Sequence, residues 1–243
     1  MRRYLAMAGL DGQTDRLAEV SEVVEQRKPE AILFAGGLGC KGCVDTSQPG
    51  FSPKQLDVYA QFLHWAGEQS MPVVVIPGPY DVPLGEFYQW STNAETDHSH
   101  VRVVHATSWR IKDTVFGGIG GAICEHDHCE HPRLQVSRAE AEYFLRNIVR
   151  DEAPLHVILL NQPPTGTLGG SSGNTIVSEL IDSLHPRLAV TAGETSHRGH
   201  EQVARTTIVN PGRLSDGSLA YIDFSRPTEE RVEVLDLATR AAV

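Results

Sequence analysis

The sequence has little of what binds polyanions or spans membranes. Its 243 residues include 31 acidic and 21 basic side chains, for a formal net charge of −10, and contain no basic run. Nucleic acids and anionic membrane surfaces attract clustered Lys and Arg, so we expect neither as a partner. No apolar run reaches the roughly 18 residues that a membrane span needs. The N-terminal apolar run ends too soon, before Asp11, for a signal peptide, and we expect a soluble, cytoplasmic protein.

The chain also lacks repeats, low-complexity tracts and linkers. With 40% hydrophobic residues it can bury one sizeable core, so we predict a single α/β domain over residues 1–243. Short apolar runs, the first three of which stop at Gly or Pro, and further segments that mostly alternate predict the strands, and helical periodicity or capping boxes predict the helices between them. The predicted strands are 4–8, 31–35, 73–76, 101–105, 109–112, 115–119, 156–160, 188–191, 206–209, 219–224 and 232–237. The predicted helices are 14–27, 52–69, 138–150 and 175–184, and the polar stretch around His98 and His100 is predicted as a flexible rim.

Five short segments follow predicted strands and look like metal-binding motifs whose ligands have been replaced. They are Ala8-Gly9-Leu10-Asp11-Gly12, Gly36-Gly37-Leu38-Gly39, Pro77-Gly78-Pro79-Tyr80-Asp81, Leu160-Asn161-Gln162-Pro163-Pro164 and Ala192-Gly193-Glu194-Thr195-Ser196-His197. In order and spacing the sequence resembles the calcineurin-like metallophosphoesterases, whose blocks read D-x-H-G, G-D, G-N-H-D/E, H-x-P-P and G-H-x-H. The last third, including Asn210-Pro211-Gly212-Arg213, is similar to the C-terminal half of the same family.

This resemblance implies a four-layer α/β/β/α sandwich with one crevice at the strand ends. In the family, Asp, His and Asn side chains there hold two metal ions that clamp a phosphate around a bridging hydroxide. The family's ligand positions fall, in order, on Gly9, Asp11, Gly37, Pro79, Tyr80, Asn161, Glu194 and Ser196. A slip of one residue would put His197 at the last position.

Three of these positions cannot supply a side-chain ligand, because glycine and proline carry no donor atom. Loss of the bridging carboxylate at Gly37 would leave two like-charged ions to repel each other, so we expect no dinuclear centre. Oxygen donors remain at Asp11, Asn161 and Glu194, with Asp81 nearby, and suit at most one Mg²⁺ or Ca²⁺. The favoured alternative is that these groups and Tyr80 hydrogen-bond one another and plug the crevice.

A second cluster has no equivalent in the family pattern. Thiols and imidazoles gather in two segments and are zinc-type ligands if the segments meet. The candidates are Cys40, Cys43, Cys124, His126, His128, Cys129 and His131. A disulfide within either segment is an alternative that a cytoplasmic location disfavours. The favoured interpretation is a solvated, His-rich loop without metal.

Three function hypotheses follow from these residues. The leading hypothesis is a non-catalytic protein that binds a small ligand or a protein partner through the crevice or the sandwich surface. The second is a phosphoesterase that uses one metal ion held by Asp11, Asn161, Glu194 and His197. The third is a zinc-binding protein built around the Cys and His segments.

Overall fold

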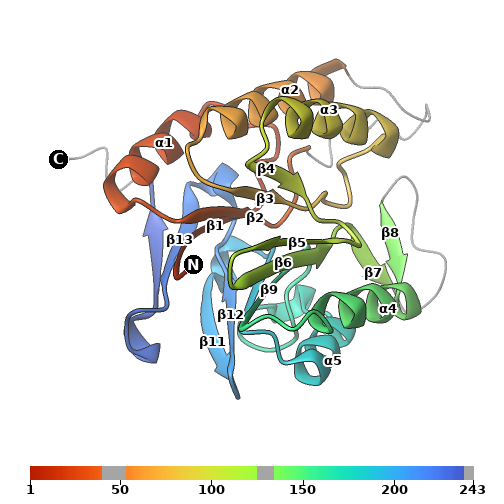
Figure 1. The fold of residues 1–243 in the computed structure, drawn as a ribbon, viewed down its shortest axis with the longest axis vertical. Helices are drawn as coiled ribbons and strands as arrows, with labels where there is room; N and C mark the ends of the chain where they lie inside the picture. The colour runs from red at the N-terminus through yellow and green to blue at the C-terminus, as the bar shows by residue number, and fades with distance from the viewer. Residues whose placement is uncertain (40–52, 125–133, 238–243) are drawn as a thin grey trace.

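The computed structural model describes residues 1–39, 53–124 and 134–237, and most of its strands form two six-stranded sheets (Figure 1). The first sheet has the order β14-β13-β1-β2-β3-β4. Strands β1 to β4 are parallel, whereas β13 and β14 are antiparallel to their neighbours. The strand bounds are β1 (Arg3–Met7), β2 (Ala31–Phe34), β3 (Val73–Val75), β4 (Val101–Val103), β13 (Ser218–Asp223) and β14 (Val232–Asp236).

The second sheet has the order β11-β12-β10-β9-β6-β5. Its four central strands are parallel, and the edge strands β5 and β11 are antiparallel to theirs. The bounds are β5 (Ser108–Ile111), β6 (Thr114–Ile119), β9 (Leu155–Leu160), β10 (Leu188–Thr191), β11 (Gly199–Val203) and β12 (Thr206–Asn210). A separate two-stranded sheet pairs β7 (Ala122–Cys124) with β8 (Gln135–Ser137).

Helices cover the outer face of each large sheet (Figure 1). The first sheet carries α1 (Arg16–Arg27), α2 (Pro53–Glu68) and α3 (Leu84–Asp97), and the second carries α4 (Arg138–Val149) and α5 (Thr175–Leu184). Short 3-10 turns lie at Gly170–Ser172, Thr195–His197, Leu214–Asp216 and Thr228–Glu230. The expected α/β/β/α sandwich is therefore confirmed.

Three apolar layers hold these four layers together, because the inner strands are buried on both faces. In β1, Leu5 and Met7 face the helices of the first sheet, whereas Tyr4 and Ala6 face the second sheet. A third layer joins the second sheet to α4 and α5. Side chains of a strand alternate between its faces, so each central strand contributes to two layers at once.

Several elements match the sequence predictions and others escaped them. Helix α4 begins with the predicted capping box, in which Ser137 and Glu140 bond reciprocally. The predicted helix 52–69 begins at Pro53 in the structure, and Ser52 lies outside the described residues. Within the described ranges, no helix is both long and apolar enough to cross a bilayer.

Helix α3 was missed because its sequence is polar and only Phe87 and Ser91 are buried along it. The stretch after it, which was predicted as flexible, contacts the helices at His98. The His98 amide closes the last turn of α3 on the carbonyl of Ala94 at 2.8 Å, and its ring lies against Gly67 of α2. Strands β7, β8 and β11 were also missed: β7 and β8 have three residues each, and β11 is mostly polar and lacks a fully buried residue.

Candidate ligand pocket at the strand ends

A pocket of about 540 Å³ opens where the five segments meet. Each segment follows a parallel strand, and the carboxyl ends of such strands face one edge of their sheet. Gly9 and Asp11 come from the loop after β1, Gly37 from that after β2, and Tyr80 from that after β3. From the second sheet, the loops after β9 and β10 supply Asn161, Gln162, Gly193 and Glu194. The pocket is therefore formed by loops at the carboxyl ends of strands from both sheets.

The floor of the pocket is backbone. We use the name floor for Gly9, Gly36, Gly37 and Gly78 together with the carboxylate of Asp81 beneath them. A Cβ atom at Gly37 would stand 3.1 Å from the Cα of Gly9, and one at Gly78 would overlap the Gly37 nitrogen. Gly37 also has a φ of +85°, in the left-handed region that favours glycine. The loops approach each other too closely here for side chains.

Asp81 holds the floor from below and is fully buried. Its carboxylate accepts hydrogen bonds from four backbone amides, those of Gly37 and Leu38 at 3.2 Å, Gly39 at 2.7 Å and Gly78 at 2.6 Å. Burial raises the pKa of Asp81, and the four N–H donors oppose that rise. Asp81 therefore ties the loop after β3 to the loop after β2.

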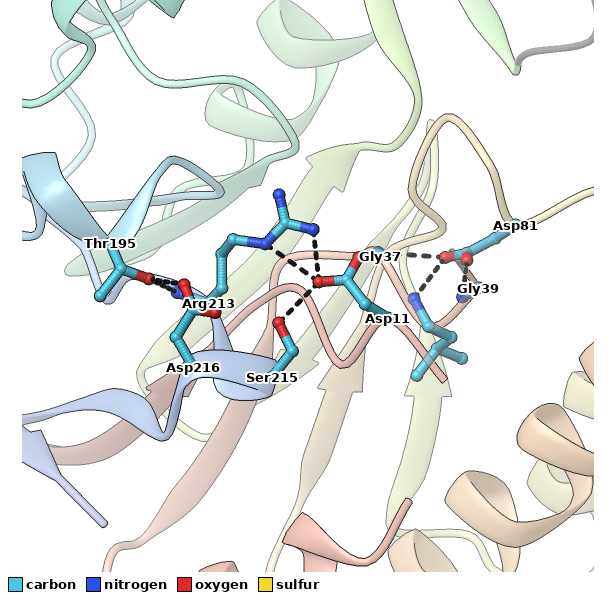
Figure 2. Close-up of polar contacts among 9 residues, drawn as sticks. Asp11, Gly37, Gly39, Asp81, Thr195, Arg213, Ser215 and Asp216 are labelled. Atoms are coloured by element: carbon cyan, nitrogen blue, oxygen red, sulfur yellow. Dashed lines mark hydrogen bonds and ion pairs between the residues drawn. The ribbon is translucent and has the colours of Figure 1, made fainter. Parts of the chain in front are cut away.

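The other acidic group of the first sheet, Asp11, belongs to the rim of the pocket. We use the name rim for Asp11, Arg213, Ser172 and Glu194. The Oδ2 atom of Asp11 accepts from Nε and Nη2 of Arg213, at 3.0 and 2.5 Å, and from the Ser215 hydroxyl at 2.8 Å. Figure 2 shows Asp11 turned toward Arg213 and Ser215, and Asp81 turned toward the backbone of Gly37 and Gly39.

Arg213 is a pocket residue that sequence reasoning missed. Its amide donates to the Thr195 hydroxyl at 3.0 Å, and that hydroxyl donates to Asp216 at 2.5 Å (Figure 2). A Cβ built at Gly9 would meet the Cβ and Cγ atoms of Arg213 at 3.3 Å, so the arginine stem lies against Gly9. One signal could have found it: a carboxylate at Asp11 without a metal needs another cation.

Amide and hydroxyl groups complete the wall contributed by the second sheet. Asn161 donates through Nδ2 to the carbonyl of Ala35 at 2.6 Å, which crosses from one sheet to the other. Gln162 Oε1 accepts from the Ile123 amide at 2.7 Å and from Asn174 Nδ2 at 3.0 Å. Glu194 accepts from the Ser172 hydroxyl at 2.9 Å. These hydrogen bonds are made to residues of the pocket walls. The prediction that Asp11, Asn161 and Glu194 hydrogen-bond one another and fill the crevice is therefore not what the structure shows.

Besides the buried Asp81, two sequence candidates lie outside the pocket lining, Ser196 and His197. The Ser196 hydroxyl is exposed and donates to Glu194 at 3.5 Å. The ring of His197 packs against Gly170, and the buried Asn210 amide donates to the carbonyl of His197 at 3.0 Å. His197 therefore serves the loop after β10 and not the pocket surface.

Most of the Cys and His candidates cannot be placed. Cys40, Cys43, His126, His128, Cys129 and His131 lie outside the described residues. Cys124 ends β7 and is disulfide-bonded, so its sulfur is not a thiolate ligand here. Zinc binding by the remaining candidates stays a prediction.

The residues of the pocket do not fit two metal ions. Gly9, Gly37 and Pro79 offer no side-chain donor, and the Arg213 guanidinium beside Asp11 would repel a cation. Among the residues that the structure describes, no three His, Cys, Asp or Glu side chains gather in a way that could hold an ion. These residues therefore do not support a reaction step through paired metal ions.

Nearly the whole sequence nevertheless matches one family. Residues 1–234 match the family described as metallophosphoesterase, calcineurin superfamily. The chain belongs to this superfamily. No curated protein matches it.

Solved structures show the same fold at low identity. The crystal structure of TT1561 of Thermus thermophilus is 24% identical with a TM-score of 0.82, over 97% of this chain and 99% of that one. A 5'-nucleotidase from Candida albicans is 11% identical with a TM-score of 0.56, over 98% of this chain and 52% of that one. An archaeal phosphodiesterase is 10% identical with a TM-score of 0.50, over 96% and 99%.

Proposed function

We propose that this protein is a non-catalytic member of the superfamily that binds a small ligand in the pocket at the strand ends. The proposal rests on one observation: residues without a side-chain donor stand at the family's metal-ligand positions, and the cationic side chain of Arg213 lies beside them. Gly9, Gly37 and Pro79 have no donor, and the Arg213 stem fills the space in front of Gly9. Hydrolysis through paired metals needs charges that stabilise the attacking and leaving oxygens, and these residues do not hold them.

Ligand binding is supported by what remains of the pocket. A volume of about 540 Å³ lies within the range of pockets that take small molecules. Its walls are fixed by hydrogen bonds between loops of both sheets, such as that from Asn161 to the Ala35 carbonyl. A pocket whose walls are held in place needs little ordering when a ligand enters, which favours affinity.

The proposal is tested by assaying aryl phosphate monoesters and diesters with Mn²⁺ or Ni²⁺ present. We expect release of the aryl alcohol at the rate of the metal-containing buffer, with an active superfamily enzyme as the positive control. Turnover of about one per second would contradict the proposal if Asp11→Ala or Asn161→Ala abolished it while the exposed-site control Asp57→Ala did not. The single-metal phosphoesterase would then be the better hypothesis.

A further inference from the structure

The charges of the pocket restrict the chemistry of a ligand. Three ionisable side chains that are charged at neutral pH line it in the described part of the chain: Asp11, Glu194 and Arg213. Two carboxylates and one guanidinium give the lining one net negative charge. A further carboxylate, that of Asp216, lies just outside the lining and accepts from Thr195 at 2.5 Å. The surroundings therefore oppose an anion.

The one cation of the lining, among the described residues, is already paired. Nε and Nη2 of Arg213 both donate to Oδ2 of Asp11, and the Ser215 hydroxyl donates to the same oxygen. A phosphate that used the guanidinium would compete with a carboxylate that is part of the fold. It would also approach the charges of Asp11 and Glu194 at close range. Arg213 thus supports the rim and is poorly available as an anion receptor.

Lining residues, by contrast, keep hydrogen-bond acceptors that the contacts described above do not use. Asn161 uses its Nδ2 on the Ala35 carbonyl, which leaves the Oδ1 end of the amide for a ligand. Oδ2 of Asp11 accepts the hydrogen bonds from Arg213 and Ser215, so Oδ1 of the same carboxylate can accept one from a ligand. Glu194 has an exposed carboxylate on the opposite wall. Gln162 supplies a donor, Nε2, because its Oε1 is used twice within the wall.

From this arrangement we infer that the pocket selects a neutral or cationic molecule rich in hydroxyl and amino groups, in preference to a phosphate ester. Ligand hydroxyls and a protonated amine would donate to Asp11, Asn161 and Glu194, and one ligand oxygen would accept from Gln162. Hydrogen bonds from an ammonium group to carboxylates are the stronger kind, and the Asp11 carboxylate is already paired with Arg213, so Glu194 contributes most to the preference. The inference rests on the proposed ligand-binding function and specifies the ligand.

The test compares glucosamine with its phosphate monoester, because the pair differs only in the anionic group. Binding of each to the full chain is measured by calorimetry at slightly acidic pH, where the amine is protonated. We expect glucosamine to bind at least tenfold more tightly than the ester. Glu194→Gln should weaken glucosamine about tenfold and the ester much less, whereas the exposed-site control Glu152→Gln should change neither.

Tighter binding of the phosphate ester, or no binding of glucosamine at millimolar concentration, would overturn the inference. The proposed function fails in a different way, by release of inorganic phosphate from the ester. Phosphate release is followed in the same samples, so the two failures are distinguishable. A folded Glu194→Gln variant with the melting temperature of the parent would show that the weaker binding is local to the pocket.

Discussion

The floor and the rim of the pocket use the same type of side chain in opposite ways. In the floor, Asp81 is fully buried and its carboxylate satisfies four backbone amides. In the rim, the side chain of Asp11 keeps 17% exposure and pairs with Arg213, whose side chain is 46% exposed. Loss of an acceptor oxygen from a buried carboxylate leaves backbone amides unsatisfied, whereas water can replace a partner lost at the rim.

This difference separates the architecture of the pocket from its chemistry. The floor fixes where the loops meet, and its glycines let them approach to backbone contact. The rim supplies charges that can change without moving the loops. Substitutions in the floor should therefore act on stability, and substitutions in the rim should act mainly on binding.

The largest effect is expected for Asp81→Asn. The amide nitrogen of Asn would face N–H donors, so at least one buried backbone amide would lose its acceptor. We expect a loss of about 3 kcal/mol in the free energy of unfolding, measured by urea denaturation. The rim counterpart Asp11→Asn should lose about 1 kcal/mol or less, because its ion pair is partly exposed. Equal losses for the two variants would contradict the distinction between floor and rim.

A smaller loss is expected for Gly37→Asp, which restores the family's bridging carboxylate. Its Cβ would lie 3.1 Å from the Gly9 Cα, at a φ of +85°. We expect a loss of about 2 kcal/mol from backbone strain and crowding, measured by urea denaturation, and no Mn²⁺-dependent hydrolysis.

Two controls separate the causes. Gly37→Ala isolates the backbone cost from that of the charge, and Gly85→Asp places the same side chain where nothing lies within 4 Å. Hydrolysis gained by Gly37→Asp alone would mean that the assignment of the family's ligand positions to this chain is wrong.

The sequence predicted the framework well because its signals are local. Apolar and alternating segments located the central strands to within two residues, and the helix 175–184 coincides with α5. The five segments that follow these strands do line one pocket. Burial on both faces imposes a continuous apolar run, which can be recognised without knowing the partner strands.

Side-chain partners were harder to predict because they join distant segments. Arg213 reaches Asp11 across 202 positions, and no local pattern marks that pairing. Asp81 was predicted to lie near the oxygen donors of the crevice, either beside a metal ion or hydrogen-bonded to its neighbours, and the structure bonds it to amides of a loop more than 40 positions earlier. The sequence showed which metal-ligand positions of the family have been lost. It did not show which contacts now occupy their place.

The smallest expected effect concerns His105, which contacts the floor only indirectly, through neighbouring backbone. Its Nδ1 accepts from the Gly120 amide at 2.9 Å, and the next amide, of Gly121, donates to the Pro77 carbonyl at 2.9 Å. Burial lowers the pKa of His105, so the folded chain keeps this imidazole neutral where the unfolded chain begins to bind a proton. The unfolded state then holds more protons, and the free energy of unfolding should fall as the pH falls below about 6.5.

His105→Gln should remove this contribution and flatten the acid side of the stability profile. At neutral pH the variant should lose less than about 1 kcal/mol, because a glutamine oxygen can accept the Gly120 amide in place of Nδ1. The measurement is the urea midpoint at a series of pH values, with the exposed His64→Gln as the matched control. If His64→Gln flattened the profile and His105→Gln did not, the His105 imidazole would not be the group that makes the stability depend on pH. If His105→Gln instead lowered the free energy of unfolding as much as Asp81→Asn does, His105 would be as important to the pocket floor as Asp81, and the floor would have to be defined to include it.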